Sequence, residues 1–321
     1  MRAFQVTEHG APPRLNVVAR TPPVKGELGL ELATCGLNFG DLLMISGQYQ
    51  ERPDLPFTLG MEMAGTVREL GPETVGPPPG TRVAVFAGHG GLAESGNFPA
   101  DRHVILPDSM SFEDAAAFQV AYGTSHLALT HRARLQPGET LLVLGAAGGV
   151  GLTAVEIGKK LGARVIACAR GADKLAVASA AGADHLIDSE TGDLRAEVKA
   201  LGGADVVYDP VGGDLFTAAL RACRPEARMV VIGFASGDVP RIPANHLLVK
   251  NVSVLGYYWG GYLAFAPQLV AASLRELLGW YQAGEIKPHV SHVLPLDRAD
   301  EGLELLRCRK STGKVVIRVA P

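Results

Sequence analysis

The stretch that decides the fold covers residues 140–151, Thr140-Leu141-Leu142-Val143-Leu144-Gly145-Ala146-Ala147-Gly148-Gly149-Val150-Gly151. Its apolar first half predicts a buried strand, and a helix-length segment follows the glycines. Between strand and helix, Ala146-x-Gly148-x-x-Gly151 has the spacing of the dinucleotide-binding fingerprint, with Ala in place of the first Gly. This context favours a phosphate-binding loop over an ordinary tight turn.

The glycines of this loop have separate physical roles. Gly148 lets the backbone approach a pyrophosphate, and Gly151 lets the helix pack closely on the strand. The start of the helix presents N–H groups without intrahelical partners and the positive end of the helix dipole, and both attract an anion. The loop residues that we expect to bind the cofactor are Ala146, Ala147, Gly148, Gly149, Val150 and Gly151.

Apolar strands and helix-length segments alternate through the middle of the chain. The predicted strands are 140–144, 164–168, 185–187, 205–208, 228–232 and 252–255. Parallel neighbours require crossover connections, and the helices of those crossovers then cover both faces of the sheet. The pattern therefore predicts an α/β Rossmann domain with a doubly wound parallel sheet.

The flanking segments have a different pattern. Residues 1–118 consist of short strand-like runs broken by Pro and Gly, which predict a β-rich domain. At 321 residues the chain exceeds the roughly 250–300 residues at which a single core stops growing. We therefore predict a β-rich domain at 1–118, the Rossmann domain at 119–257, and a C-terminal segment at 258–321 whose last strand, 314–319, returns to the sheet of the first domain.

The end of the second predicted strand indicates which dinucleotide binds. NAD-preferring folds place an Asp or Glu there, about 20 residues past the glycine loop, to hold the ribose 2′-OH. This chain has Ala167-Cys168-Ala169-Arg170-Gly171-Ala172-Asp173-Lys174, with no acid at the strand end. Arg170 and Lys174 supply cations that suit a 2′-phosphate, so the sequence predicts NADPH as the cofactor. The alternative is that both are ordinary solvated residues at the start of a helix.

Composition excludes several classes of protein. The hydrophobic fraction of 47% is typical of globular chains, the formal net charge is −3, and no run of Lys and Arg suggests nucleic-acid or anionic-lipid binding. Cys35, Cys168, Cys223 and Cys308 form no Cys-x-x-Cys pair, which argues against a zinc ribbon, a redox dithiol or a disulfide framework. No apolar run approaches the ~18 residues of a membrane span, and no secretory core opens the chain, so we expect a cytoplasmic protein without a membrane partner.

Motifs across the whole chain resemble one known family. They are Leu37-Asn38-Phe39-Gly40-Asp41-Leu42-Leu43, Gly60-Met61-Glu62-Met63-Ala64-Gly65, the glycine loop, Gly182-Ala183-Asp184-His185, Asp209-Pro210-Val211-Gly212-Gly213 and Thr312-Gly313-Lys314-Val315-Val316. Together they resemble the zeta-crystallin-type quinone oxidoreductases, in the zinc-free branch of the medium-chain dehydrogenase/reductase superfamily. The resemblance implies a GroES-like catalytic domain for the β-rich part.

Two positions that hold zinc in alcohol dehydrogenases of this superfamily lack good ligands in this chain. Asn38 stands where those enzymes have Cys, and Gly60-Met61-Glu62 stands where they have Gly-His-Glu. The four-Cys lobe of their structural zinc is also absent. The nine His residues show neither the i, i+4 spacing of a helical metal pair nor neighbouring Cys ligands. We therefore predict no metal site.

The resemblance also implies which residues line the nicotinamide pocket. They are Asn38, Asp41, Tyr49, Thr124, Gly233 and Phe234. Tyr49 is the best candidate for donating a hydrogen bond to the substrate oxygen, although it could serve only to position the nicotinamide or be a surface aromatic in a loop. Asn38 is the second catalytic candidate, with a backbone-capping amide in a turn as its alternative. Asp41 is expected to be structural.

Three further expectations follow from the resemblance. Tyr257 resembles an aromatic residue that lies near the cofactor in the family, and a core aromatic cluster is an equal alternative. The segment 170–174 departs from the family, in which small hydroxyl residues are frequent there, although Lys174 matches; how the 2′-phosphate is held stays open. The sixth strand, at 251–256, would end the sheet with unpaired backbone groups, and the family commonly closes this edge across a two-fold axis, so we expect a homodimer.

These features together predict NADPH-dependent reduction of quinones or activated enones, by direct hydride transfer in the cleft between the domains. Such acceptors delocalise the developing negative charge over a conjugated oxygen, so hydrogen-bond donors could replace a Lewis acid. Two alternatives stay open. One is an enoyl-thioester reductase, which would need a basic mouth that the sequence does not reveal, and the other is a non-catalytic NADPH-binding protein.

Overall fold

Two units make up residues 1–320, the part of the chain that the computed structural model describes. The first unit consists of Met1–Val120 and the residues from Lys287 onward, and the second consists of Ala121–Ile286. The stretch 258–286, which the sequence assigned to the C-terminal segment, therefore clusters with the second unit.

Helix α10 (Pro267–Gln282) explains where this stretch belongs. It buries Val270, Leu274 and Leu277. His126 of α3 (Gln119–Leu127) lies with its Nδ1 2.8 Å from Ser273 Oγ of α10, which joins the two helices. The apolar face of α10 thus has its partners inside the second unit, a pairing that periodicity alone does not reveal. None of the helices within residues 1–320 is long and apolar enough to cross a membrane.

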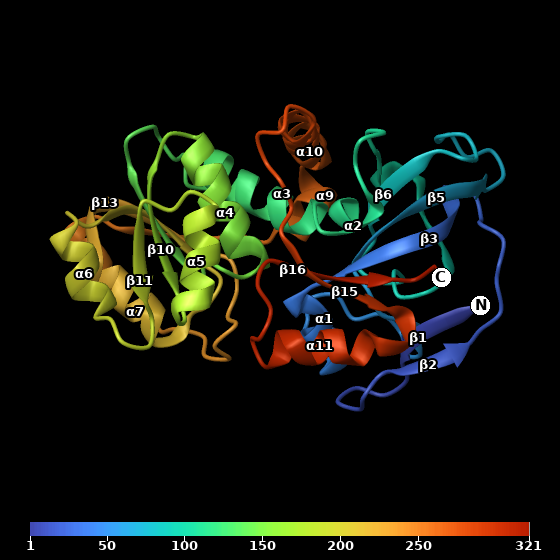
Figure 1. Cartoon of the computed structure of the whole chain (residues 1–321), viewed down its shortest axis with the longest axis horizontal. Helices are drawn as coiled ribbons and strands as arrows, with labels where there is room; N and C mark the ends of the chain where they lie inside the picture. Colours follow the sequence, from blue (N-terminus) through green and yellow to red (C-terminus); the bar gives the residue numbers. More distant parts are fainter. Residues whose placement is uncertain (321) are drawn as a thin grey trace. The chain divides into compact units, whose positions relative to one another are not determined.

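Six parallel strands form the sheet of the second unit, in the order β11-β10-β9-β12-β13-β14. Figure 1 labels β10, β11 and β13 of this sheet. They are β9 (Thr140–Leu144), β10 (Arg164–Ala169), β11 (His185–Asp188), β12 (Ala204–Asp209), β13 (Cys223–Val231) and β14 (Ser253–Gly256). The helices between them are α4 (Gly149–Lys160), α5 (Ala172–Ala180), α6 (Leu194–Ala200), α7 (Gly213–Ala222) and α8 (Ala244–Lys250). The strand order reverses between β9 and β12, and the predicted doubly wound Rossmann sheet is confirmed.

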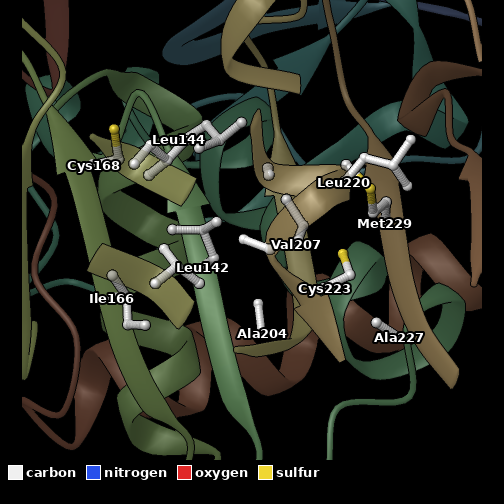
Figure 2. Close-up of a cluster of buried hydrophobic side chains, with 14 of the residues drawn as sticks. Leu142, Leu144, Ile166, Cys168, Ala204, Val207, Leu220, Cys223, Ala227 and Met229 are labelled. Atoms are coloured by element: carbon white, nitrogen blue, oxygen red, sulfur yellow. The ribbon is translucent and has the colours of Figure 1, made fainter. Parts of the chain in front are cut away.

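Apolar side chains of these strands make the core of the sheet. Every residue of β9 is buried. Leu142 and Leu144 of β9 lie with Ile166 and Cys168 of β10 in one buried cluster (Figure 2). A strand that is covered on both faces needs a continuous apolar run instead of alternation, which is why 140–144 was recognisable as a buried strand.

The first unit is built mainly of antiparallel strands. Its larger sheet has the order β15-β16-β3-β5-β6-β8, with β7 also paired to β3, and its smaller sheet has the order β2-β1-β4. The strands are β1 (Arg2–Val6), β2 (Arg14–Val17), β3 (Glu27–Leu37), β4 (Phe57–Thr58), β5 (Glu62–Leu70), β6 (Arg82–Phe86), β7 (Ser95–Pro99), β8 (His103–Ile105), β15 (Val290–Pro295) and β16 (Lys314–Arg318). The remaining α-helices within residues 1–320 are α1 (Phe39–Ile45), α2 (Phe112–Ala116), α9 (Trp259–Phe265) and α11 (Ala299–Arg307), and a π-helical turn, Ala128–Arg132, continues α3.

Strand β16 joins the end of the chain to the first sheet. It runs antiparallel to β3, with Val316 opposite Gly36, and parallel to β15. This pairing places Lys314, the first residue of β16, next to the end of β3, which Asn38 follows directly in the chain. Lys314, from the C-terminal part of the chain, therefore lies beside the candidate residue Asn38.

Candidate active site

The glycine loop leaves β9 and enters α4 with the geometry that its spacing predicts. Gly145 has a positive φ of 61°, and its carbonyl oxygen accepts a hydrogen bond from Gly148 N (3.0 Å). A Cβ atom at Gly151 would lie 2.2 Å from that carbonyl oxygen, whereas a Cβ atom at Gly148 would meet nothing closer than 3.4 Å. Gly151 is thus required for close packing of the loop on the helix, and Gly148 leaves the backbone open to a ligand.

The first turn of α4 offers hydrogen-bond donors to such a ligand. Gly148 is the N-cap, and this helix end has no capping side chain in the described part of the chain. The first N–H groups of any α-helix lack intrahelical acceptors, and here they belong to Gly149, Val150 and Gly151 at the positive end of the helix dipole. Together with the exposed Gly148 they form a cradle that fits a pyrophosphate.

A buried hydroxyl network holds this turn in place. Ser125 Oγ of α3 donates to Val150 O (2.8 Å) and lies 2.8 Å from Thr153 Oγ1 and 2.9 Å from Tyr208 Oη. These contacts join α3, α4 and β12, so they fix the direction in which the first turn of α4 points. Thr124, implied by the resemblance, is buried beside Ser125 in the chain, with 7% of its surface exposed.

Arg170 and Lys174 lie where the second strand of the sheet ends. Arg170 follows β10 directly, and Lys174 lies in the first turn of α5. Arg170 Nε is 3.3 Å from Glu190 Oε1, and both side chains are about half exposed. Glu190 follows β11, the strand beside β10. The predicted cations therefore share this strand end with a carboxylate that the local sequence pattern does not reveal.

Gly233 and Phe234 follow β13, and a hydrogen bond ties Gly233 to Asp209, the last residue of the neighbouring strand β12. Gly233 N donates to Asp209 O (3.3 Å), while Asp209 Oδ1 accepts hydrogen bonds from Val211 N (2.8 Å) and Gly212 N (2.9 Å). Burial raises the pKa of Asp209. Phe234 is 36% exposed. Asp209 therefore shapes the turn against which the candidate residues Gly233 and Phe234 are held.

Tyr257 lies in an aromatic cluster of the second unit. Its ring centroid is 5.7 Å from that of Tyr262, which in turn is 4.5 Å from that of Phe265. The Tyr257 hydroxyl is buried without a hydrogen-bond partner among residues 1–320, and burial raises its pKa. The geometry matches the aromatic-cluster alternative, and contact with a cofactor stays a prediction.

In the first unit, Asn38 is part of a buried charged cluster. Lys314 Nζ donates to Leu37 O (2.8 Å), Asn38 Oδ1 (2.7 Å) and Glu62 Oε1 (2.6 Å). Asn38 Nδ2 donates to Gly36 O (3.2 Å) and Glu62 Oε1 (3.0 Å). All three ammonium hydrogens and both amide hydrogens are used in these bonds. Asn38 consequently has no hydrogen left for a substrate unless one of these bonds breaks.

Tyr49 and Met61 cover the start of α1. A Cβ atom at Gly40 would lie 3.1 Å from Tyr49 Cε2 and 2.8 Å from Met61 Sδ. The absence of a side chain at Gly40 thus lets the partly exposed Tyr49 ring lie against the first turn of α1, whose N-cap is Asn38. The two candidates of the first unit are therefore brought to the same helix end.

Asp41 is completely buried in that first turn. Its carboxylate accepts hydrogen bonds from Asn38 N (2.7 Å) and Gly60 N (3.3 Å). Burial raises the pKa of Asp41 to about 7, against the opposing effects of these N–H donors and of Lys314. The contacts hold the start of α1 to the residue before Met61, which fits the structural role that the sequence suggests.

The positions equivalent to zinc ligands carry an amide and a thioether. Asn38 is engaged with Lys314 and Glu62, and Met61 is 2% exposed. Neither side chain is a usual zinc ligand, since zinc takes thiolate, imidazole and carboxylate groups. Within residues 1–320 there is no group of three or more His, Cys, Asp or Glu side chains placed to hold a metal ion.

Comparison with known proteins identifies the family. The model of the alcohol dehydrogenase GroES-like domain matches residues 24–108, and the model described as zinc-binding dehydrogenase matches residues 149–276. Over 320 residues the chain is 40% identical to quinone oxidoreductase-like protein 2 of Bos taurus, and the match covers 98% of this chain and 92% of that protein. The chain belongs to the quinone oxidoreductase family of medium-chain dehydrogenases/reductases.

Solved structures of quinone oxidoreductases have the same fold. The Escherichia coli quinone oxidoreductase, complexed with NADPH, is 30% identical, with a TM-score of 0.94 over 99% of this chain and 100% of that chain. The Thermus thermophilus quinone oxidoreductase, solved alone and with NADPH, is 34% identical, with a TM-score of 0.87 over 99% and 100% of the two chains. The predicted pairing of a GroES-like domain with a Rossmann domain is thus confirmed, and this member of the quinone oxidoreductase family is an oxidoreductase.

Sequence reasoning missed three sets of residues in this quinone oxidoreductase family member. They are the Lys314–Glu62 pair, the hydroxyl network of Ser125, Thr153 and Tyr208, and the carboxylate of Glu190. Lys314 and Glu62 each begin an otherwise apolar strand segment, and charges in such places indicate a buried pair. No comparable signal marks Glu190.

Proposed function

We propose that this protein reduces quinones or activated enones with NADPH, by direct hydride transfer and without a metal. The observation that carries the proposal is the glycine loop, where the open approach at Gly148 and the first-turn N–H groups of α4 form an anion cradle. The similar solved structures support the proposal, because both are quinone oxidoreductases in complex with NADPH.

In this proposal, different residues bind the cofactor and stabilise the reacting substrate. The loop 146–151 holds the pyrophosphate, Arg170 and Lys174 hold the 2′-phosphate, and Thr124, Gly233, Phe234 and Tyr257 are the proposed contacts of the rest of the cofactor. NADPH, when bound, supplies the hydride. A conjugated acceptor spreads the resulting negative charge over its oxygen, so a hydrogen-bond donor can stabilise it in place of a metal.

Tyr49 is the proposed donor to that oxygen. Its ring lies against Gly40 at the start of α1, and the side chain is partly exposed. Asn38 takes a positioning role in this proposal, because its amide hydrogens already donate to Gly36 O and Glu62 Oε1. The start of α1 is then held rigid by Asn38 while Tyr49 faces the substrate.

A panel of acceptors tests the substrate class. Steady-state rates with NADPH are measured for a 1,2-quinone, a 1,4-quinone, a simple enone and an enoyl-CoA, and NADPH binding is titrated separately. We expect turnover of the quinones or the simple enone. Turnover of the enoyl-CoA alone would assign the chain to the enoyl-thioester reductases, and tight NADPH binding without turnover of any acceptor would contradict an enzymatic role.

Arg170→Ala is expected to weaken NADPH binding by about ten- to a hundredfold and to leave NADH binding nearly unchanged. Charge-assisted hydrogen bonds contribute roughly 1.5–3 kcal/mol, and only NADPH carries the 2′-phosphate. The measurement is kcat/KM for both cofactors with one quinone, together with the two dissociation constants. Arg275→Ala, which removes an exposed arginine from α10, is the matched control. Equal loss for both cofactors would contradict the assignment of Arg170 to the 2′-phosphate.

We also propose a homodimer joined along β14. This strand is the last of its sheet, with β13 as its only strand partner within residues 1–320. The helix α8, which precedes β14 in the chain, exposes the apolar residues Leu248 and Val249 to 79% and 80%. An edge strand of this kind is a template for pairing with a second chain. Light scattering at micromolar concentration should give about twice the mass of one chain, and a monomer would rule the dimer out.

A further inference from the structure

Backbone hydrogen bonds fix the segment that carries Glu190 beside Arg170. Ser189 N donates to Ala169 O (2.9 Å), which continues the pairing of β11 with β10 past their ends. Asp188 Oδ1 then accepts hydrogen bonds from Gly171 N (3.1 Å) and Glu190 N (3.0 Å). The backbone on both sides of the ion pair is therefore tied together, and the Arg170–Glu190 contact at 3.3 Å is a consequence of the strand ends.

The two carboxylates at this strand end differ in what they do. Asp188 is engaged by backbone N–H groups, and these donors hold its pKa below the usual value. Glu190 instead lies with its carboxylate against the Arg170 guanidinium, and its side chain is 55% exposed. A dianionic phosphate that approached Arg170 would have to displace this carboxylate and would meet its negative charge at close range.

We infer that Glu190 is a specificity-determining residue that limits the preference for NADPH over NADH. Its carboxylate competes with the 2′-phosphate for Arg170 and repels that phosphate. The 2′-hydroxyl of NADH carries no charge, so the same carboxylate does not lower the affinity for NADH and can accept a hydrogen bond from this hydroxyl. The inference rests on the proposed function, in which Arg170 binds the 2′-phosphate of NADPH.

Glu190→Gln tests this directly, because Gln keeps the size of the side chain and removes its charge. Dissociation constants of NADPH and NADH are measured by titration of the nicotinamide fluorescence, which does not depend on the substrate. An exposed ion pair contributes up to about 1 kcal/mol, so NADPH should bind roughly two- to fivefold more tightly to the variant. NADH should bind equally well or slightly more weakly. The gain for NADPH should shrink as salt is raised from about 0.05 to 0.5 M.

Glu285→Gln is the matched control. Glu285 pairs with Lys160 (2.7 Å) at the C-terminal end of α4, the end opposite to the glycine loop, and its side chain is 46% exposed. This variant loses the same charge from the same unit, and its NADPH affinity should stay at the native value. A gain as large as that of Glu190→Gln would reduce the effect to net charge and overturn the inference.

A double-mutant cycle with Arg170→Ala separates the inference from the function on which it rests. In the Arg170→Ala background, Glu190→Gln should gain less than in the native one, because no guanidinium is left to be released and only the direct repulsion of the phosphate is removed. An undiminished gain in that background, or no gain in the native one, overturns the role of Glu190 while the Arg170 site stands. If Arg170→Ala itself leaves NADPH affinity unchanged, the proposed 2′-phosphate site is wrong.

Discussion

Replacing Lys314 by Met is expected to lower the free energy of unfolding of the first unit by about 3–5 kcal/mol. The Lys314 and Glu62 side chains are 6% and 1% exposed, and their charged atoms are 2.6 Å apart. Met keeps most of the length of the side chain but leaves the Glu62 carboxylate buried without its cation, and Asn38 Oδ1 loses its donor. Both tryptophans, Trp259 and Trp280, lie in the second unit, so unfolding is followed by far-UV circular dichroism and by hydrogen exchange in β3 and β16.

Two further variants show whether the effect comes from the buried pair. Lys314→Met combined with Glu62→Gln should be less destabilised than the sum of the two single changes, because the double variant leaves no uncompensated charge. Lys25→Met is the surface control, since Lys25 and Glu73 form an ion pair whose side chains are 72% and 77% exposed. Such pairs contribute little to stability. If Lys314→Met were as stable as Lys25→Met, the cluster around Asn38 would not hold this part of the fold.

Gly151→Ala is expected to have the second large effect, on both stability and cofactor binding. The added Cβ atom would lie 2.2 Å from Gly145 O and 2.8 Å from Gly145 C, both of which are backbone atoms. The loop or the helix must therefore shift, which costs roughly 1–3 kcal/mol, and the anion cradle at the start of α4 shifts with it. We expect a lower midpoint of thermal unfolding together with a loss of NADPH affinity of more than about tenfold.

Gly148→Ala separates the two effects. Gly148 has a φ of −79°, which alanine adopts freely, and its Cβ atom would meet only Gly145 O at 3.4 Å. The variant should unfold at nearly the native temperature but bind NADPH more weakly, because the methyl group stands where the pyrophosphate approaches the backbone. Calorimetry and cofactor titration of both variants make the comparison. Native NADPH affinity in Gly148→Ala would show that this loop does not hold the pyrophosphate.

The candidate site shows where prediction from sequence succeeds and where it stops. The loop between β9 and α4 and the close packing at Gly151 were predicted, because they depend on residues within a few positions of each other. The positive φ at Gly145 was not predicted. Asn38 and Tyr49 were predicted as candidates by resemblance, but their surroundings were not. The engagement of the Asn38 amide by Lys314 and Glu62 depends on β16 lying beside β3.

Local sequence patterns also did not show to which of the two units helix α10 belongs. Its apolar periodicity predicts an amphipathic helix, and the helix is present at Pro267–Gln282. Periodicity says that one face is buried and does not say against what. The contact between His126 and Ser273 attaches the helix to the second unit, so the unit extends to Ile286.

By itself the sequence determined the order of strands and helices along the middle of the chain, the phosphate-type loop, and the lack of usual zinc ligands at residues 38 and 61. These features depend on residue type and short-range spacing. Only the tertiary structure decided the charged contacts, because Lys314 meets Glu62 across 252 positions, and Glu190 meets Arg170 where two neighbouring parallel strands end. Such pairs depend on which strands are adjacent in the sheet, and hydrophobic periodicity carries no information about strand order.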